Sequence, residues 1–124
     1  MKPILFLLFL SSCSTFQSQR MTKTELYFGL SKPDGSIIAL KDFQAFADTI
    51  IAKTFTEGST LIDAHGQWLG QDGKLVSEPS KVLIVMSKLN VERSRQIELV
   101  RKKYKKYFQQ ESVLRVDGKV VVGF

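Results

Sequence analysis

Three polar side chains alternate along one short stretch of the chain, at Asp63, His65 and Gln67. In a β-strand, residues two apart lie on the same face, so this pattern sets a carboxylate beside the only histidine of the chain. Such a carboxylate can orient an imidazole or raise its basicity. The spacing is therefore typical of an acid–base or ligand site on one face of a strand.

Side chains on neighbouring strands could complete this site. If Ile62 and Ala64 face the helices of an α+β domain, the polar residues face the open side of the sheet. The site would then comprise Asp63, His65, Glu25, Tyr27 and Arg115. The alternative is a solvated sheet face, whose charges pair with little gain in stability.

Trp68 offers a different kind of site. It is the only tryptophan, and its flat ring and single N–H donor could stack on a sugar or an aromatic ligand, with Gln67 beside it. It could equally be a core or edge residue that supports a hairpin at Asp72-Gly73. Both interpretations stay open.

The sequence lacks the motifs of several other reaction classes. Zinc usually takes histidine and cysteine ligands, whereas this chain has one of each. Ser80 and Ser112 do not lie in nucleophile-elbow sequences, and no phosphate-binding glycine loop is present. We therefore predict no metal site and no cofactor.

The second predicted helix is strongly basic away from its apolar stripe. Its cations are Arg93, Arg95, Arg101, Lys102, Lys103, Lys105 and Lys106. This surface could bind anionic headgroups or an anionic envelope polymer. Alternatively it is a solvated face whose late cations complement the helix dipole. A net charge of +6 favours anionic partners. Nucleic acid is disfavoured among them, because the first residues of the chain predict export from the cytoplasm.

The first residues of the chain predict its location in the cell. Lys2 precedes an apolar run, residues 4–10, that is too short to span a bilayer and is typical of an export signal. The next residues, Leu10-Ser11-Ser12-Cys13, resemble a bacterial lipobox. We expect cleavage before Cys13 and a lipid anchor in the cell envelope. The location would be the periplasmic face of an outer membrane where the host has one, because Ser14 is not aspartate.

Two alternatives to this address stay open. One is an ordinary signal peptide with a chance cysteine, and the other is translation from Met21, which would leave a cytosolic protein. With a lipid anchor, residues 1–12 are the signal peptide and residues 13–22 are the lipidated cysteine and a tether. Residues 23–124 then form one α+β domain, a length that folds without disulfides.

Hydrophobic periodicity predicts the elements of this domain. The expected strands are 23–30, 59–69, 82–86, 112–116 and 119–124, and the expected helices are 40–53 and the segment that Asn90 caps. Turn residues at 33–35, 72–73 and 117–118 separate them. The order is ferredoxin-like, β-α-β-β-α-β with an extra C-terminal strand. Two helices would cover one face of an antiparallel sheet, and solvent or a second copy, as in a homodimer, would cover the other.

Four segments resemble a known family. They are 24–29 (Thr-Glu-Leu-Tyr-Phe-Gly), 66–68 (Gly-Gln-Trp), 80–83 (Ser-Lys-Val-Leu) and 111–116 (Glu-Ser-Val-Leu-Arg-Val). Together they resemble domain-of-unknown-function family 3574, a family of small secreted bacterial proteins. The resemblance implies an exported single domain and no particular activity.

Two hypotheses for the function follow. The first is a non-enzymatic binding or accessory module of the cell envelope. The second is a small enzyme of the dimeric ferredoxin-like type, with a site on the open sheet face around Asp63 and His65. Ferredoxin-like folds host both binding modules and enzymes, so the fold does not distinguish the two hypotheses. The residues of the site have to distinguish them.

Overall fold

The computed structural model describes residues 17–124, so the predicted signal peptide, Cys13 and residues 14–16 lie outside the described part. The described elements are β1 (Ser18–Gly29), α1 (Leu40–Phe46), η1 (Ala47–Ile51), α2 (Ala52–Thr54), β2 (Thr60–Leu69), β3 (Leu75–Ser87), α3 (Val91–Phe108) and β4 (Leu114–Gly123). The elements α1, η1 and α2 follow one another without a break and form one helical segment. The element order is therefore β-α-β-β-α-β.

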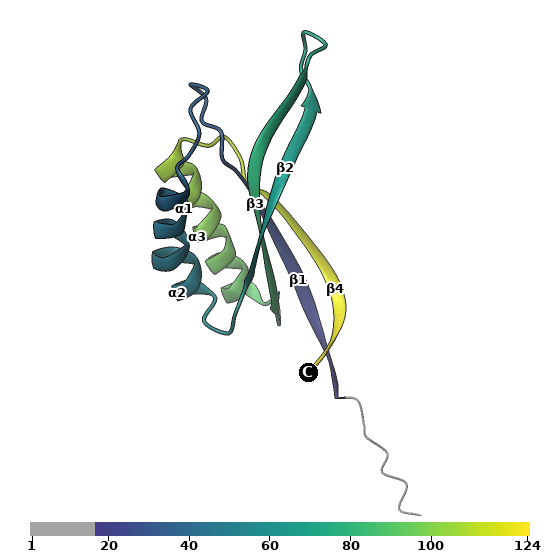
Figure 1. Ribbon diagram of the computed structural model, residues 1–124. Coiled ribbons are helices and arrows are strands. Elements are labelled where there is room, and N and C mark those ends of the chain that lie inside the picture. Colours follow the sequence, from purple (N-terminus) through teal and green to yellow (C-terminus); the bar gives the residue numbers. More distant parts are fainter. Residues whose placement is uncertain (1–16) are drawn as a thin grey trace, which may run out of the picture.

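The four strands form one antiparallel sheet in the spatial order β2-β3-β1-β4. The two helical segments pack on the same face of this sheet, and no described segment covers the other face (Figure 1). This arrangement confirms the predicted ferredoxin-like α+β fold. The sheet extends past the helices in both directions. We call the end with the β2–β3 loop the hairpin end, and the end where β1 begins and β4 finishes the amino-terminal end.

The core lies between the sheet and the helices and is built from aromatic rings. Phe28 on β1 lies 4.5 Å from Tyr104 on α3, and Phe46 on α1 lies 5.3 Å from Tyr104, measured between ring centroids. The Tyr104 hydroxyl donates a hydrogen bond of 2.7 Å to the carbonyl of Gly29, which satisfies its polar end inside the core. The predicted apolar stripe of α3 is confirmed, since Ile97, Val100, Tyr104 and Phe108 are all buried.

The two ends of α3 have recognisable caps, whereas the start of α1 has none. The Asn90 side chain accepts a hydrogen bond of 2.7 Å from the Arg93 amide, which confirms the predicted N-cap of α3. Gln109 adopts a left-handed conformation, with φ at 49°, and ends that helix. Ala39 makes no side-chain cap at the start of α1, because alanine has no side-chain acceptor.

The carboxyl-terminal strand differs from the prediction. We expected two strands joined at Asp117-Gly118, whereas β4 runs through this pair as one strand and pairs with β1 from Leu114 to Gly123. Asp117 is held in the strand because its carboxylate accepts a hydrogen bond of 2.6 Å from the Thr24 hydroxyl. The extra C-terminal strand is therefore absent from the sheet of residues 17–124.

Strand β1 also begins earlier than expected. Residues 18–22, which we assigned to a tether, pair with residues 119–123 of β4. This pairing extends β1 towards the amino-terminal end, so that Ser18 lies only five positions after Cys13. The two other predicted turns are confirmed, with positive φ angles at Gly35 and Gly73.

Candidate functional site

Strand alternation sorts the candidate residues between the two faces of the sheet. On β1, Leu26 and Phe28 are buried beneath the helices, so Glu25 and Tyr27 lie on the opposite, open face. The register carries this division across the sheet, because paired residues share a face. The open face therefore includes Ile84, which pairs with Glu25, and Leu114, which pairs with Tyr27.

Glu25 and Tyr27 form a local pair on the open face. The Tyr27 hydroxyl donates a hydrogen bond of 2.7 Å to Glu25 Oε2, and Lys23 Nζ lies 2.9 Å from Glu25 Oε1. The Tyr27 hydrogen bond and Lys23 lower the pKa of Glu25. The same hydrogen bond raises the pKa of Tyr27. At neutral pH this pair is a carboxylate with a neutral phenol, which suits ligand binding better than proton transfer.

Arg115 does not join this pair. It pairs with Leu26 in the register and lies on the helix-covered face. Its Nη1 donates to Glu98 Oε1 at 2.8 Å and to Ser94 Oγ at 3.1 Å, which ties β4 to α3. Its side chain is only 13% exposed. The predicted role of Arg115 beside Glu25 and Tyr27 is wrong, and the residue contributes to the packing of α3.

Asp63, His65 and Gln67 also lie on the other side from the prediction. Asp63 pairs with Lys81 and His65 with Pro79, both in the helix-facing alternation of β3. Lys81 Nζ forms an ion pair with Asp63 Oδ1. The trio stays exposed because β2 is an edge strand that runs out past the helices (Figure 1). Ile62 and Ala64, expected beneath the helices, lie on the open face instead.

The structure thus divides the five predicted site residues between two faces. Glu25 and Tyr27 lie on one side of the sheet, and Asp63, His65 and Arg115 lie on the other. A site on the open face around Asp63 and His65 is therefore excluded by the register.

A cavity of about 580 Å³ lies at the hairpin end, and we call it the hairpin-end cavity. Trp68 and Tyr27 supply its aromatic surface, and Trp68 is 48% exposed. The loops at 31–35 and 109–112 form the remaining wall. Gln67 alternates to the opposite side of β2 and is absent from the lining. Of the two ligand-binding candidates, the structure therefore brings only Trp68 to a cavity.

Glu78 is the residue of this cavity that sequence reasoning missed. Gly66 pairs with it directly, and a Cβ atom built on Gly29 would lie 2.9 Å from Glu78 Oε1. Gly29 thus leaves room for the carboxylate, which is a recognised reason for glycine within a strand, whereas a Cβ atom on Gly66 would lie at an ordinary contact distance of 3.7 Å from Glu78 Cγ. Within residues 17–124, the Glu78 carboxylate takes part in no hydrogen bond or ion pair. It is an available acceptor beside two aromatic rings.

The charge of the hairpin-end cavity is opposite to that of the whole chain. Glu78 and Glu111 line it together with a single cation, Lys32, while the full chain carries a net charge of +6. Burial of Tyr104, followed by the charge of Glu78, raises the pKa of that tyrosine, so its hydroxyl stays protonated as the donor to Gly29. The cavity therefore favours ligands that carry hydrogen-bond donors or positive charge.

The basic residues of α3 fall into two groups. The arginines pair within the fold: Arg93 with Glu57 at 3.0 Å, Arg95 with Glu92 at 3.0 Å, and Arg101 with Glu98 at 2.6 Å. No ion pair forms, among the described residues, at Lys102, Lys103, Lys105 or Lys106. The basic surface is therefore smaller than predicted and consists of these four lysines.

Two further properties of residues 17–124 bear on the site. None of their helices is long and apolar enough to cross a membrane. They also contain no cluster of three or more histidine, cysteine, aspartate or glutamate residues that could hold a metal ion.

Comparison with known proteins identifies a family and a fold. The family described as "Protein of unknown function (DUF3574)" matches residues 23–124. No curated protein matches the chain.

The solved structures that resemble this domain include a phage SAM lyase. Its apo state has a TM-score of 0.61 at 21% identity and covers 85% of this chain and 89% of the lyase chain. Its complex with S-methyl-5'-thioadenosine has a TM-score of 0.60 at 20% identity, with 84% and 88% covered. The periplasmic divalent cation tolerance protein CutA from Archaeoglobus fulgidus has a TM-score of 0.47 at 12% identity, with 82% and 84% covered. At these identities, the resemblance to the lyase shows a shared fold.

Proposed function

The chain belongs to the DUF3574 family, and from this premise we propose that it is a lipid-anchored, non-enzymatic binding module of the bacterial cell envelope. Its ligand would occupy the hairpin-end cavity. The observation that carries the proposal is the Glu78 carboxylate, which has no partner among residues 17–124 and lies in a cavity that Trp68 and Tyr27 also line.

The envelope address rests on the amino-terminal sequence. The apolar run at 4–10 and the residues Leu10-Ser11-Ser12-Cys13 support export and acylation of the cysteine. The lipid would hold the chain to the membrane. Since β1 begins at Ser18, the domain would stand close to the membrane with its amino-terminal end towards it.

The chemistry of the cavity indicates the class of ligand. An exposed indole provides a flat apolar surface on which a sugar ring or an aromatic ring can stack. The Glu78 carboxylate accepts hydrogen bonds and attracts positive charge, and hydrogen bonds to a charged group are the stronger kind. A sugar unit with hydroxyl or amino groups can stack on the indole and donate hydrogen bonds to the carboxylate. We therefore expect the ligand to be an amino-sugar unit of an envelope polymer.

Binding is favoured over catalysis by the residues that the cavity contains. His65 lies on the opposite side of the sheet, and Asp63 is paired with Lys81. Tyr27, with its raised pKa, is a poor general base near neutral pH. The side chains of the cavity can hold and orient a ligand, but they do not form a matched acid and base.

The open sheet face gives the possible homodimer a specific surface. It carries exposed apolar side chains, Ile62, Met86, Leu114 and Val116 among them. Its charged residues are Lys23, Glu25 and Glu78, so the excess positive charge of the chain lies elsewhere. Two copies of a positively charged chain repel each other least where that excess is absent. Four strands of 10 to 13 residues project roughly 700 Å², close to the area of about 800 Å² that each partner of a stable complex buries.

Intrinsic fluorescence provides a direct test, because Trp68 is the only tryptophan. Titration of the chain with a glucosamine oligosaccharide should change the Trp68 emission. Glu78→Gln keeps the shape of the side chain and removes its charge, so it should weaken binding at least about tenfold. Gln67→Ala is the matched control, since residue 67 lies on the same strand but outside the cavity. Unchanged emission with both glucosamine and N-acetylglucosamine oligosaccharides would contradict the proposed ligand.

The same titration addresses the enzyme hypothesis. S-methyl-5'-thioadenosine, the molecule bound to the phage SAM lyase structure, serves as the probe. Tight binding of this molecule, lost in Glu78→Gln, would favour a nucleoside-handling enzyme over a sugar-binding module. No response to it would agree with the proposed function.

A further inference from the structure

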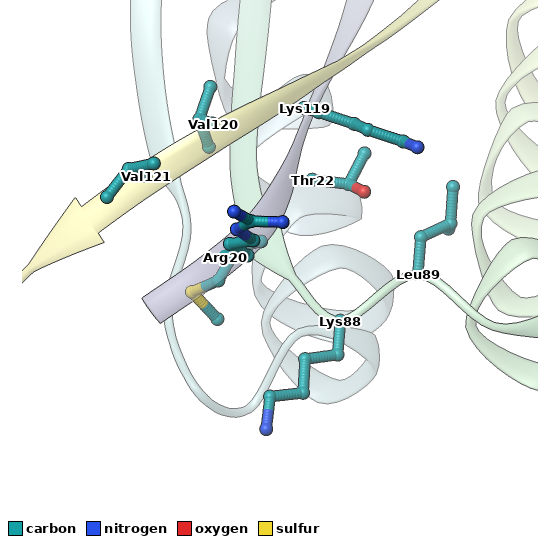
Figure 2. Close-up of a pocket in the computed structure, with 8 residues that line it drawn as sticks. Arg20, Thr22, Lys88, Leu89, Lys119, Val120 and Val121 are labelled. Carbon is teal, nitrogen blue, oxygen red and sulfur yellow. The ribbon is translucent and has the colours of Figure 1, made fainter. Parts of the chain in front are cut away.

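A second cavity, of about 620 Å³, lies at the amino-terminal end of the domain, and we call it the basic cavity. Three cations line it, Arg20 on β1, Lys88 after β3 and Lys119 on β4 (Figure 2). No acidic residue belongs to the lining, and within residues 17–124 none of the three cations forms an ion pair. Three segments distant in sequence thus bring uncompensated positive charge to one place.

Apolar residues accompany these cations. Leu89 and Val121 line the same cavity and are 36% and 66% exposed. Val91 and Phe124, at the same end of the domain, are 76% and 91% exposed. Positive charge interspersed with exposed aliphatic and aromatic side chains is the composition of surfaces that lie at the headgroup boundary of a bilayer.

The position of the basic cavity, close to the predicted lipid anchor, also favours contact with a membrane. Arg20 lies only seven positions after Cys13, and β1 begins at Ser18. Five residues of extended chain span at most about 18 Å. If Cys13 carries lipid, the amino-terminal end of the sheet stays within this distance of the membrane surface. The lysines of α3 at 102–106 lie in the second half of that helix, towards the hairpin end (Figure 1).

We infer that the basic cavity is a docking site for anionic phospholipid headgroups, whose phosphates meet the positive charge of Arg20, Lys88 and Lys119. Leu89, Val121 and Phe124 contact the acyl boundary beside it. The orientation that follows presents the hairpin-end cavity away from the membrane. The inference rests on the proposed function only for the lipid on Cys13, which brings this end to the bilayer.

Vesicle binding by the unlipidated chain tests this site. Every described strand, helix and core residue lies within 17–124, so a chain that starts at residue 13 with Cys13→Ser contains the whole domain. It should bind vesicles of phosphatidylglycerol in phosphatidylcholine and lose binding as salt is added. A basic residue near an anionic surface strengthens binding roughly fivefold, so replacing all three should weaken it about 100-fold.

Charge-matched variants locate the binding surface. The site variant is Arg20→Gln with Lys88→Gln and Lys119→Gln, and the control is Lys102→Gln with Lys103→Gln and Lys106→Gln on α3. Both remove three charges from exposed or half-exposed positions. The site variant should lose binding and the control should keep it. The reverse result, or equal binding of the parent chain to pure phosphatidylcholine vesicles, would overturn the inference.

The anchor is tested separately. Mass spectrometry of the full chain, recovered from membranes, should show lipid on Cys13. An unmodified Cys13 would overturn the anchor and the orientation derived from it. The vesicle experiment would still decide whether the basic cavity binds anionic headgroups, so the two failures are distinguishable.

Discussion

The two faces of the sheet use similar residues for different purposes. On the covered face, Phe28 is fully buried among the rings of Phe43, Phe46 and Tyr104, with centroids 4.5 to 6.3 Å from its own. On the open face, Ile62 remains 45% exposed. Both faces are apolar, and yet only one is packed by described residues. Apolar character alone therefore does not identify the core, because a surface for another molecule looks the same in the sequence.

The largest expected effect is on the covered face. Phe28→Ala should lower the free energy of unfolding by about 3–5 kcal/mol, because it leaves a cavity inside the aromatic core. Ile62→Ala, on the open face, should cost less than about 1 kcal/mol at protein concentrations low enough to keep copies apart. Urea unfolding followed by circular dichroism measures both values. Equal losses would mean that the open face is packed even in the monomer.

An intermediate effect is expected on association through the open face. Light scattering of the chain from residue 13 with Cys13→Ser should give twice the monomer mass. Val116→Arg places an unpaired charge in the interface and should weaken the dimer by about 3 kcal/mol. Leu99→Arg on the exposed side of α3 is the matched control and should leave the mass unchanged. A monomeric parent chain would refute the homodimer.

The smallest effect is expected on the free energy of unfolding at acidic pH. Burial raises the pKa of Glu98, but hydrogen bonds from Arg115 and Arg101 outweigh it and lower that pKa below its ordinary value of 4.5. A lowered folded-state pKa contributes stability above the unfolded-state pKa, and this contribution is lost as the pH falls through the folded-state value. Because Glu98 is half-exposed, we expect less than about 1 kcal/mol.

Urea unfolding between about pH 7 and about pH 3 tests the linkage. Glu98→Gln should flatten the loss of stability on acidification, while Glu92→Gln, in an exposed pair at the start of α3, should leave the slope nearly unchanged. An identical acid slope in Glu98→Gln would show that the contacts of Arg115 with α3 do not depend on this charge.

The sequence predicted the element order because the relevant signals are local. Helical periodicity, the Asn90 cap and the turn glycines Gly35 and Gly73 each depend on a few neighbouring residues. The face of β2 was predicted wrongly because it depends on the whole sheet. An edge strand that extends past the helices can expose polar residues on its helix-facing side, as Asp63 and His65 do.

Asp117-Gly118 illustrates a competing signal. The pair is a strong hairpin turn in isolation, but Leu114, Val116, Val120 and Val122 keep a single alternation through it. A two-residue turn would have sent Val116 and Val120 to opposite faces. Pairing with β1 from Ser18 to Tyr27, together with the Thr24 hydrogen bond, outweighs the local turn preference. Glu78 was missed for a related reason. Its cavity forms only when the pairing of β3 with β2 and β1 places Gly66 and Gly29 beside it.

The pairing of β1 with β4 has a consequence for the time course of folding. Ser18 lies opposite Gly123, so the first described strand finds one of its two neighbours only in the last ten-residue strand of the chain. Closing so long a loop is slow, and contacts of high sequence separation delay folding. A nascent chain therefore holds β1 with an unpaired edge until β4 has emerged. The sheet cannot be completed before β4 is available to β1, and such a delay would suit the proposed export, because an exported chain crosses the membrane before it folds.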